Sequence, residues 1–566
     1  MQGVVTHFLE RRRIRPAVLV LALLALTPAA FILNRVAEAS RDIAYWDEYD
    51  TALKLVLQLD SGVSVPGFFA RLFEVSNEHR MVTSRLMFAA SYWLTGTVDF
   101  AVISWIGNAS LLLLCGLLIW SVQTPLRRLR LAVVLAMLMF QLEHYENFLW
   151  SGSSIDHFQV VMLAVAAALG LARTSRAGLL VACVCAVLAT FTLAHGIVIW
   201  PVGAAVLWRA RRWSHLATWG TLTAVAAGGF LAGFHINTAQ RFVDPSFAGA
   251  VTVAHYWLAT LGSVPALGVN ALAPWLGAVL LVGLVVIGLR GALHREPVAF
   301  PLAIYAVAAL ALIAVGRAAE SAGVVHSRYY VLSALAWAMV IFMWLERATH
   351  PRRPLALLWG CLPVLVAFNL AANQRFAAKA DTWLECRDRA AVRFKQFGVD
   401  GSGPFTLHPA PAHATRLLAE AERRGVYRMG PVCDEVPFPP KAKPSSRIKY
   451  FVEEITVNGR AAAVAGWAAI PGLPSERGQV HIILRSPVET RVFTAVTITR
   501  PDVAAALQHR DCELSGFRFA RLRESLPTGE FQIGFLIAHD EGDEYIMTDH
   551  RLRLVGDGKA LLATAD

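Results

Sequence analysis

Three carboxylates lie close together near the start of the chain, in the segment Trp46-Asp47-Glu48-Tyr49-Asp50. The segment follows the first long hydrophobic run, and charged side chains beside a membrane segment are costly to keep unless they have a function. A carboxylate that faces a hydroxyl group can remove its proton as a new bond forms. We therefore expect Asp47 or Glu48 to be a general base, with Asp50 orienting that base or contacting the substrate. The alternative is a solvated acidic loop flanked by aromatic interfacial anchors.

Further polar clusters interrupt the hydrophobic sequence, and one of them contains two arginines suited to an anion. Arg328-Tyr329 opens an apolar run, and Arg317 precedes it across the same loop. Arginine can contact two phosphate oxygens at once and stays charged near lipid. We therefore expect a phosphate contact at Arg328, with Arg317 serving a second pair of oxygens. The alternative is that both arginines pair with Glu320 or extend to the membrane interface.

The remaining clusters combine hydrogen-bonding side chains with aromatic residues, a mixture that is typical of carbohydrate sites and also of ordinary interfacial loops. The cluster that begins at Asn77 can equally be a capped helix start. The pair His195-Gly196 can equally be a turn. The residues predicted to contact substrate in these clusters are Asn77, His79, Arg80, Glu146, Asn147, Asp156, His157 and His195. Carboxylates also suit divalent metals, but no second acidic pair has ligand spacing, so we expect neither a metal nor a cofactor.

These clusters are carried by hydrophobic segments. The chain has 566 residues, of which 56% are hydrophobic and only 16% are charged, whereas soluble domains carry about 25% charge. Since a spanning helix needs about 20 apolar residues, the candidate spans are roughly 16–35, 99–121, 129–144, 157–173, 177–194, 195–209, 215–234, 270–290, 297–316, 329–347 and 354–372. Segments 51–60, 65–75 and 81–96 are amphipathic or too short, and we expect them at the membrane surface. The sequence thus predicts a polytopic helical membrane protein with about eleven spans.

Arginine-rich loops alternate with the polar clusters along these spans. The loops around Arg13, Arg128, Arg211 and Arg290 all fall on the same side as the N-terminus. Cytoplasmic loops are enriched in arginine and lysine, so this side is predicted to be cytoplasmic and the polar clusters are predicted to share one cavity at the outer face. The net charge of +11 therefore reflects membrane orientation rather than binding to nucleic acid.

The C-terminal part of the chain is less hydrophobic. Segments 375–397 and 411–424 read as amphipathic helices, and a proline-rich linker follows at 436–446. Residues 447–556 alternate apolar and polar side chains in short runs, which is typical of a β-sandwich of about seven or eight strands. We expect a membrane domain at 1–375, a helical connector and linker at 376–446 and a β-sandwich at 447–566. Trp467 is predicted to be a core residue of the sandwich, and glycan binding is the alternative.

Several motifs resemble segments of the GT-C superfamily of integral-membrane glycosyltransferases, in particular bacterial relatives of dolichyl-phosphate-mannose protein mannosyltransferases and of aminoarabinose transferases. The resemblance covers residues 1 to about 375 and includes the acidic first outer loop and the surface helices after it. Its motifs are Asn77-Glu78-His79-Arg80, Tyr145-Glu146-Asn147-Phe148-Leu149-Trp150, Phe191-Thr192-Leu193-Ala194-His195-Gly196 and Ser327-Arg328-Tyr329. The β-domain is similar to sandwich appendages found on some glycosyltransferases.

The resemblance implies inverting transfer of a sugar from a polyprenyl-phosphate donor to a glycan or lipid-linked acceptor. It implies a bacterial inner-membrane protein that acts on the periplasmic side. Eleven crossings from the cytoplasmic N-terminus that the arginine-rich loops predict would put the β-domain on that same side. Asp47 matches the aspartate that is the base in this superfamily, although Glu48-Tyr49-Asp50 matches an alternative acid-x-acid pattern, and Arg328-Tyr329 would hold the donor phosphate. The alternatives are a transporter or flippase for a lipid-linked glycan, and a non-catalytic assembly protein that binds glycan.

Overall fold

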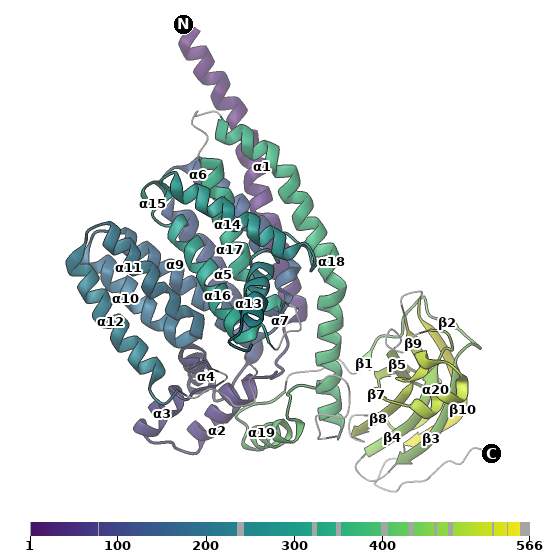
Figure 1. The fold of residues 1–566 in the computed structure, drawn as a ribbon. Coiled ribbons are helices and arrows are strands. Elements are labelled where there is room, and N and C mark those ends of the chain that lie inside the picture. Colours follow the sequence, from purple (N-terminus) through teal and green to yellow (C-terminus); the bar gives the residue numbers. More distant parts are fainter. Residues whose placement is uncertain are drawn as a thin grey trace. The chain divides into compact units, whose positions relative to one another are not determined.

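The computed structural model describes residues 2–76, 78–234, 243–319, 325–346, 353–397, 406–429, 435–457, 461–473, 479–522, 526–539 and 542–554. Their contacts divide the chain into two units (Figure 1). The first unit consists of Met1–Asp42 and Asp50–Thr382, and the second consists of Ile43–Tyr49 and Trp383–Asp566. The acidic segment is therefore split, because Asp47 and Glu48 group with the C-terminal part of the chain and Asp50 groups with the helices.

The regular secondary structure described in the first unit is helical, apart from an isolated β-bridge between Ser76 and His79. Its helices are α1 (Gln2–Ala39), α2 (Lys54–Asp60), α3 (Val65–Leu72), α4 (Val82–Thr95), α5 (Phe100–Ser121), α6 (Pro125–Met139), α7 (Tyr145–Leu149), α8 (Ser151–Ser153), α9 (Gln159–Ala172), α10 (Arg176–Thr192), α11 (Ile199–Arg209), α12 (Trp213–Leu231), α13 (Phe247–Leu261), α14 (Ala273–Leu289), α15 (Ala292–Arg295), α16 (Ala299–Arg317), α17 (Tyr330–Glu346) and the first part of α18 (Arg353–Phe397). Figure 1 shows α3 and α4 at one end of this helical bundle and α15 at the other.

Five segments of the described chain are long and apolar enough to cross a membrane: Val18–Ala39, Phe100–Ser121, Ser151–Ala172, Ala299–Arg317 and Ser327–Glu346. Shorter apolar helices are Arg176–Thr192, Phe247–Leu261 and Ala273–Leu289. These lengths and compositions support the prediction of a helical membrane protein. The larger count of eleven spans stays a prediction.

Two helices differ from the sequence-based expectation. Helix α13 was not predicted, because its 15 residues are fewer than the roughly 20 that define a span. Helix α18 runs unbroken for 45 residues with Pro363 inside it, whereas a span at 354–372 and a separate helix from 375 were expected. The fall in hydrophobicity after residue 373 changes the surroundings of this helix without interrupting its local backbone hydrogen bonds.

Several 3₁₀ and π-helical turns occur where the polar clusters lie. Between residues 49 and 329, the described chain has π-helical turns η1 (Tyr49–Leu53) and η3 (Ser154–Phe158), and 3₁₀ turns η2 (Leu142–His144), η4 (Ala194–Val198) and η5 (Ser327–Tyr329). Such turns often mark functional positions in helical proteins. The predicted site residues Asp156, His157, His195 and Arg328 therefore all lie where the regular α-helix is interrupted.

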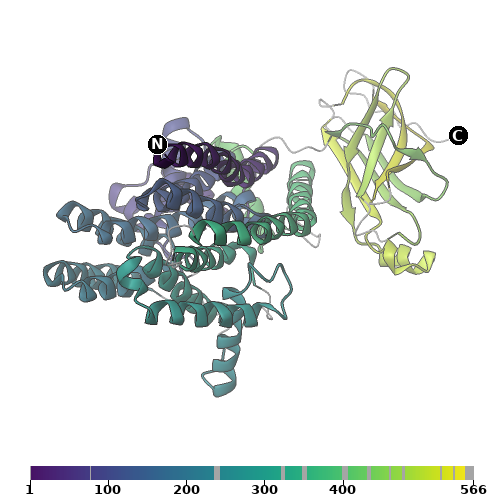
Figure 2. The same cartoon turned by 90° about the horizontal axis from the view of Figure 1, so that it is seen from above.

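The C-terminal part of the second unit is a β-sandwich. Its strands are β1 (Glu435–Val436), β2 (Lys443–Pro444), β3 (Lys449–Val457), β4 (Ala461–Ala469), β5 (Gln479–Arg485), β6 (Thr490–Thr494), β7 (Val496–Ile498), β8 (Gly516–Leu522), β9 (Gly529–Ala538) and β10 (Glu544–Leu554). One sheet has the order β1-β6-β5-β9-β10-β2 and the other β3-β4-β8-β7. Figure 2 shows the short helix α20 (Pro501–Leu507) at one end of the sandwich.

Both sheets contribute to one hydrophobic core, with Val464 and Phe517 from one sheet and Ile482 and Phe535 from the other. The predicted C-terminal all-β domain is therefore confirmed, with two extra short strands from the linker. The prediction of a core role for Trp467 is wrong, since this side chain is half-buried and is not among the core residues. Side chains alternate between the faces of a strand, so Val464 and Trp467 of β4 lie on opposite faces.

Candidate functional site

Three histidines from distant parts of the first unit come together, and we call His79, His157 and His195 the imidazole cluster. The rings of His157 and His195 are stacked with their centroids 6.2 Å apart. His79 Nδ1 accepts a hydrogen bond of 3.1 Å from the backbone N–H of Ala194, beside His195. Tyr329 packs against His157 with ring centroids 5.7 Å apart. All four side chains were predicted from the sequence to contact substrate, and the structure brings them together.

Two nitrogens of the imidazole cluster lack a hydrogen-bond partner in the described part of the chain. These buried atoms are His157 Nδ1 and His195 Nε2. The side-chain oxygen Oε1 of Gln159 is in the same state. Buried polar atoms in folded proteins nearly always have a partner, and each exception calls for an explanation such as a bound ligand. Gln159 was missed by the sequence reasoning, although an amide two residues after a histidine in an apolar run was a usable signal.

His79 is held in a defined protonation state. Burial lowers the pKa of His79 from 6.5 to about 3, and the charges of His195, Arg317 and Arg328 act in the same direction. The imidazole is therefore neutral at pH 7. Because its Nδ1 accepts the Ala194 N–H, the single proton of the neutral ring is on Nε2. His79 is consequently an uncharged hydrogen-bonding group, and a bond to the Glu78 backbone, which raises its pKa, takes part of that capacity.

Arg328 lies on turn η5 at the start of α17, with its guanidinium 5.4 Å from the centre of the Tyr329 ring. The turn is fastened to α7 by two side chains. Glu146 Oε2 accepts hydrogen bonds from Ser327 Oγ at 2.8 Å and from Arg328 N at 3.2 Å. Asn147 Nδ2 donates to the Arg328 carbonyl at 2.9 Å. Glu146 and Asn147 thus brace the turn that carries Arg328, and their predicted direct contact with substrate stays a prediction.

Arg317 ends helix α16 and pairs with Glu78, with 3.4 Å between Nη2 and Oε2. Glu78 has a backbone φ of +61°, a left-handed conformation that is uncommon for residues other than glycine. Both side chains are half-buried, and the charge of Arg317 reaches His79. Arg317 therefore belongs to the same site as Arg328, with part of its charge balanced by a carboxylate.

Arg80 is buried and its guanidinium donates to backbone carbonyls. Nε and Nη2 bond to the Phe230 carbonyl at 3.1 and 2.8 Å, and further bonds reach the carbonyls of Phe73 and Ala232. These bonds tie the segment that carries His79 to the end of helix α12. The contacts favour a bracing role for Arg80 over the predicted substrate contact, which the structure leaves as a prediction.

Arg85 of helix α4 is buried, and its guanidinium donates to the carbonyls of Leu72, Glu74 and Arg80 and to Ser76 Oγ. Burial lowers the pKa of Arg85, while the carboxylates of Glu74, Asp156 and Asp50 act in the opposite direction. Asp156 also accepts a hydrogen bond from Ser84 Oγ. Asp50 and Asp156 therefore both lie near one buried cation in the first unit. Asn77, another predicted contact, lies outside the described residues.

Asp47 and Glu48 occupy different surroundings within one tight turn of the second unit. Glu48 is only 1% exposed, and its Oε2 accepts a hydrogen bond of 2.7 Å from the Tyr45 N–H. Asp47 is half-buried. Trp46 has a φ of +48°, and such strained residues cluster at functional sites. The Glu48 carboxylate thus stabilises the turn internally, whereas the Asp47 side chain is partly exposed.

The donor set of the helical unit suits an anion. Arg328 and Arg317 supply positive charge, His79 supplies an uncharged imidazole, and the buried nitrogens of His157 and His195 have hydrogen-bonding capacity to spare. Among the described residues, no group of three or more His, Cys, Asp and Glu side chains is arranged to hold a metal ion. An arginine with several N–H donors in an apolar bundle is the chemistry that binds a phosphate.

Comparison with family models, with curated proteins and with solved structures found no match to this chain.

Proposed function

We propose that this chain is an inverting glycosyltransferase of the GT-C type, which transfers a sugar from a polyprenyl-phosphate donor to a glycan or lipid-linked acceptor. The proposal is carried by one observation, the meeting of Arg328 with the imidazole cluster inside a unit of apolar helices. A phosphate attached to a lipid tail needs cationic and N–H donors beside lipid. Arginine remains charged in such surroundings.

In the proposed reaction, an acceptor hydroxyl oxygen attacks the anomeric carbon of the sugar. The bond from that carbon to the phosphate oxygen breaks, and the polyprenyl phosphate leaves with the bonding electron pair. The negative charge that develops on the leaving oxygen is stabilised by Arg328 and by the uncharged imidazole of His79. Asp47 takes the proton from the attacking hydroxyl. Direct displacement of this kind inverts the anomeric centre.

The choice of Asp47 over Glu48 as the base is supported by their surroundings. Glu48 is buried and accepts the Tyr45 N–H, so a proton on its carboxylate would weaken a bond that stabilises the turn. Asp47 is half-buried in the same turn. Asp50, whose charge acts on Arg85, would then orient the acceptor.

We place the reaction at the outer face of a bacterial inner membrane, with the N-terminus in the cytoplasm and the β-sandwich in the periplasm. The arginine-rich loops support this orientation. A transporter would need polar sites toward both faces. At the α15 end of the bundle, Arg127 pairs with Glu296 at 2.7 Å and Arg130 with Glu346 at 2.5 Å. Since these charges neutralise each other, they give little support to a second substrate site.

The proposal is tested with Asp47→Asn in the full chain and with Glu48→Gln as the matched variant. The donor is first identified by comparing the surface-glycan composition of cells with and without the chain. Transfer is then measured in membranes that contain each variant and are supplied with the corresponding polyprenyl-phosphate-linked sugar. General base catalysis contributes about 10²–10⁴-fold, so Asp47→Asn is expected to lose at least about 100-fold in kcat with normal membrane insertion. Glu48→Gln should retain most of the activity per folded molecule. Full activity of Asp47→Asn would overturn the assignment of Asp47, and an unchanged surface glycan without the chain would overturn the proposed function.

A further inference from the structure

The turn that carries Asp47, residues Ile43–Tyr49, groups with the part of the chain that begins at Trp383, which we call the connector up to residue 446. Two hydrogen bonds fasten its backbone. The Trp46 N–H donates to the Leu407 carbonyl at 2.7 Å, and the Ala44 N–H donates to the Tyr427 hydroxyl oxygen at 3.1 Å. Leu407 and Tyr427 are both fully buried. The connector therefore contacts the turn on the N-terminal side of Asp47.

Aromatic side chains of the connector pack on both sides of Asp47. The Tyr45 ring meets Trp383 edge-on, with centroids 5.3 Å apart and an interplanar angle of 84°. The Tyr49 ring lies 5.5 Å from the imidazole of His408. Tyr45 and Tyr49 are 6% and 0% exposed. Since the residues two before and two after Asp47 are anchored, the position of Asp47 is fixed from both directions.

The turn itself is tight and strained. Trp46 is left-handed with φ +48°, and the Glu48 and Tyr49 N–H groups bond back to the carbonyls of Tyr45 and Trp46, each at 3.2 Å. Strained backbone conformations persist only where surrounding contacts over-determine them. The bonds from Leu407 and Tyr427 are contacts of that kind, because they fix the backbone next to the strained residue.

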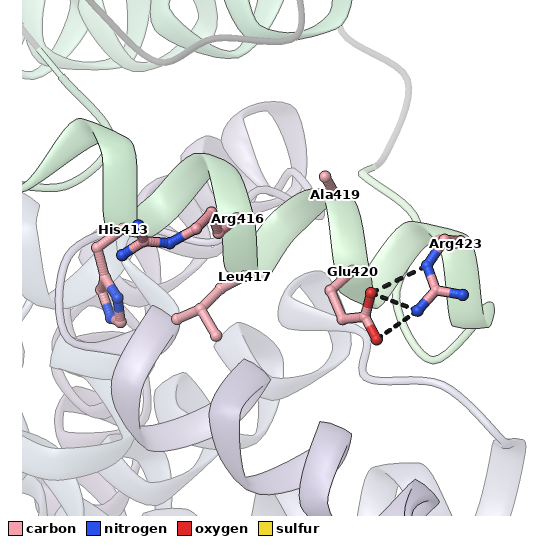
Figure 3. Close-up of a pocket in the computed structure, with 6 residues that line it drawn as sticks. All are labelled: His413, Arg416, Leu417, Ala419, Glu420 and Arg423. Carbon is pink, nitrogen blue, oxygen red and sulfur yellow. Dashed lines mark hydrogen bonds and ion pairs between the residues drawn. The ribbon is translucent and has the colours of Figure 1, made fainter.

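Helix α19 (Pro411–Arg424) places Tyr427. The helix ends at Gly425, whose φ of +72° gives a left-handed cap, and the Val426 and Tyr427 N–H groups bond to the Ala421 carbonyl at 3.1 and 3.4 Å. Leu418 and Ala421 are buried on one face of the helix. Figure 3 shows polar side chains along a different face, where Glu420 pairs with Arg423. The buried face of α19 therefore fixes the direction in which Tyr427 points.

We propose that Tyr427 is a positioning residue for Asp47, and that the connector is part of the catalytic apparatus rather than a spacer between two domains. Its hydroxyl accepts the Ala44 N–H and so holds the strained turn in the one conformation that aims the Asp47 carboxylate at the acceptor hydroxyl. This inference rests on the proposed function, in which Asp47 is the general base. It goes beyond that function because it assigns a role to Tyr427, which is 383 positions after its bonding partner Ala44 in the sequence.

The test is Tyr427→Phe in the full chain, which removes only the hydroxyl group and keeps the buried ring. Tyr450→Phe, a half-buried tyrosine that packs on the sandwich core, is the matched control. We expect Tyr427→Phe to lower kcat about tenfold and to leave the KM for the lipid-linked donor unchanged, because the donor phosphate is bound elsewhere. The control should keep the wild-type kcat. Trp383→Leu, which removes the ring against Tyr45, is a second probe of the same turn and should also lower kcat.

A double variant separates positioning from a general structural role. If Tyr427 acts through the turn, the effect of Tyr427→Phe on kcat depends on whether Trp46→Gly is also present. The fold-loss of kcat in the double variant should then differ at least about threefold from the product of the fold-losses in the two single variants. Independent losses of kcat, or a wild-type kcat in Tyr427→Phe, would overturn the proposal. An inactive Asp47→Asn beside a fully active Tyr427→Phe would refute this inference alone, whereas a fully active Asp47→Asn would refute the assignment of the base.

Discussion

Replacing Glu146 with alanine should weaken donor binding by loosening the turn that carries Arg328. The carboxylate accepts two hydrogen bonds, from Ser327 Oγ at 2.8 Å and from Arg328 N at 3.2 Å. A hydrogen bond to a charged group contributes about 1.5–3 kcal/mol. Because Ser327 Oγ can rotate toward another acceptor, we expect the free energy that holds the Arg328 turn to fall by about 2–3 kcal/mol in total. Since 1.4 kcal/mol is about tenfold in an equilibrium constant, the donor KM should rise roughly 30–100-fold.

The assay is steady-state transfer in membranes with a varied concentration of lipid-linked donor. Glu146→Gln keeps an acceptor oxygen but loses the charge, so it should raise the KM by about tenfold or less. Glu38→Gln is the matched control, because Glu38 is an exposed partner of Arg35 on helix α1. Surface ion pairs contribute about 0–1 kcal/mol, and this variant should behave as wild type.

The opposite kinetic pattern would refute the reasoning. If Glu146→Ala lowered kcat and left the donor KM unchanged, Glu146 would act on the reacting groups in the transition state and not through Arg328. That result would favour the direct substrate contact predicted from the sequence. A wild-type KM and kcat together would show that the two hydrogen bonds do not control the Arg328 turn.

Three further predictions concern the backbone and pH. Trp46→Gly should be more stable than Trp46→Ala by about 1 kcal/mol, because only alanine is strained at φ +48°; equal thermal midpoints would contradict this. Gly466→Ala should expose the sandwich to limited proteolysis, since its Cβ would lie 2.1 Å from the Phe451 carbonyl oxygen, and wild-type resistance would count against the packing argument. His79 has its pKa lowered from 6.5 to about 3 in the folded state, so the unfolded state binds more protons between these values. The contribution of neutral His79 to the free energy of unfolding should therefore be complete above pH 6.5 and should fall toward pH 3. Thermal midpoints of wild type and His79→Gln that change in parallel with pH would refute this prediction.

Elements with strong local signals were predicted well. Helix α19 was expected at 411–424 and is observed as Pro411–Arg424, because its amphipathic pattern and its final Gly425 are both local. Helix α13 was missed because a short apolar helix gives a weak signal in any sequence window. The outward direction of Trp467 was also missed, since two neighbouring residues of a strand point to opposite faces and only the packing of the sheets decides which face is buried.

The sequence by itself determined which chemical groups are available and where they interrupt the apolar helices. Acids, histidines and arginines in those interruptions were predicted to form a polar site, and His79, His157, His195 and Arg328 were among the residues predicted for it. Only the tertiary structure decided which arginine braces the backbone. Arg80 bonds to a carbonyl 150 positions away, and Glu146 bonds to Ser327 across 181 positions. Burial and hydrogen-bond pairing depend on such distant partners, so two residues alike in sequence, such as Asp47 and Glu48, acquire different surroundings only when the chain folds.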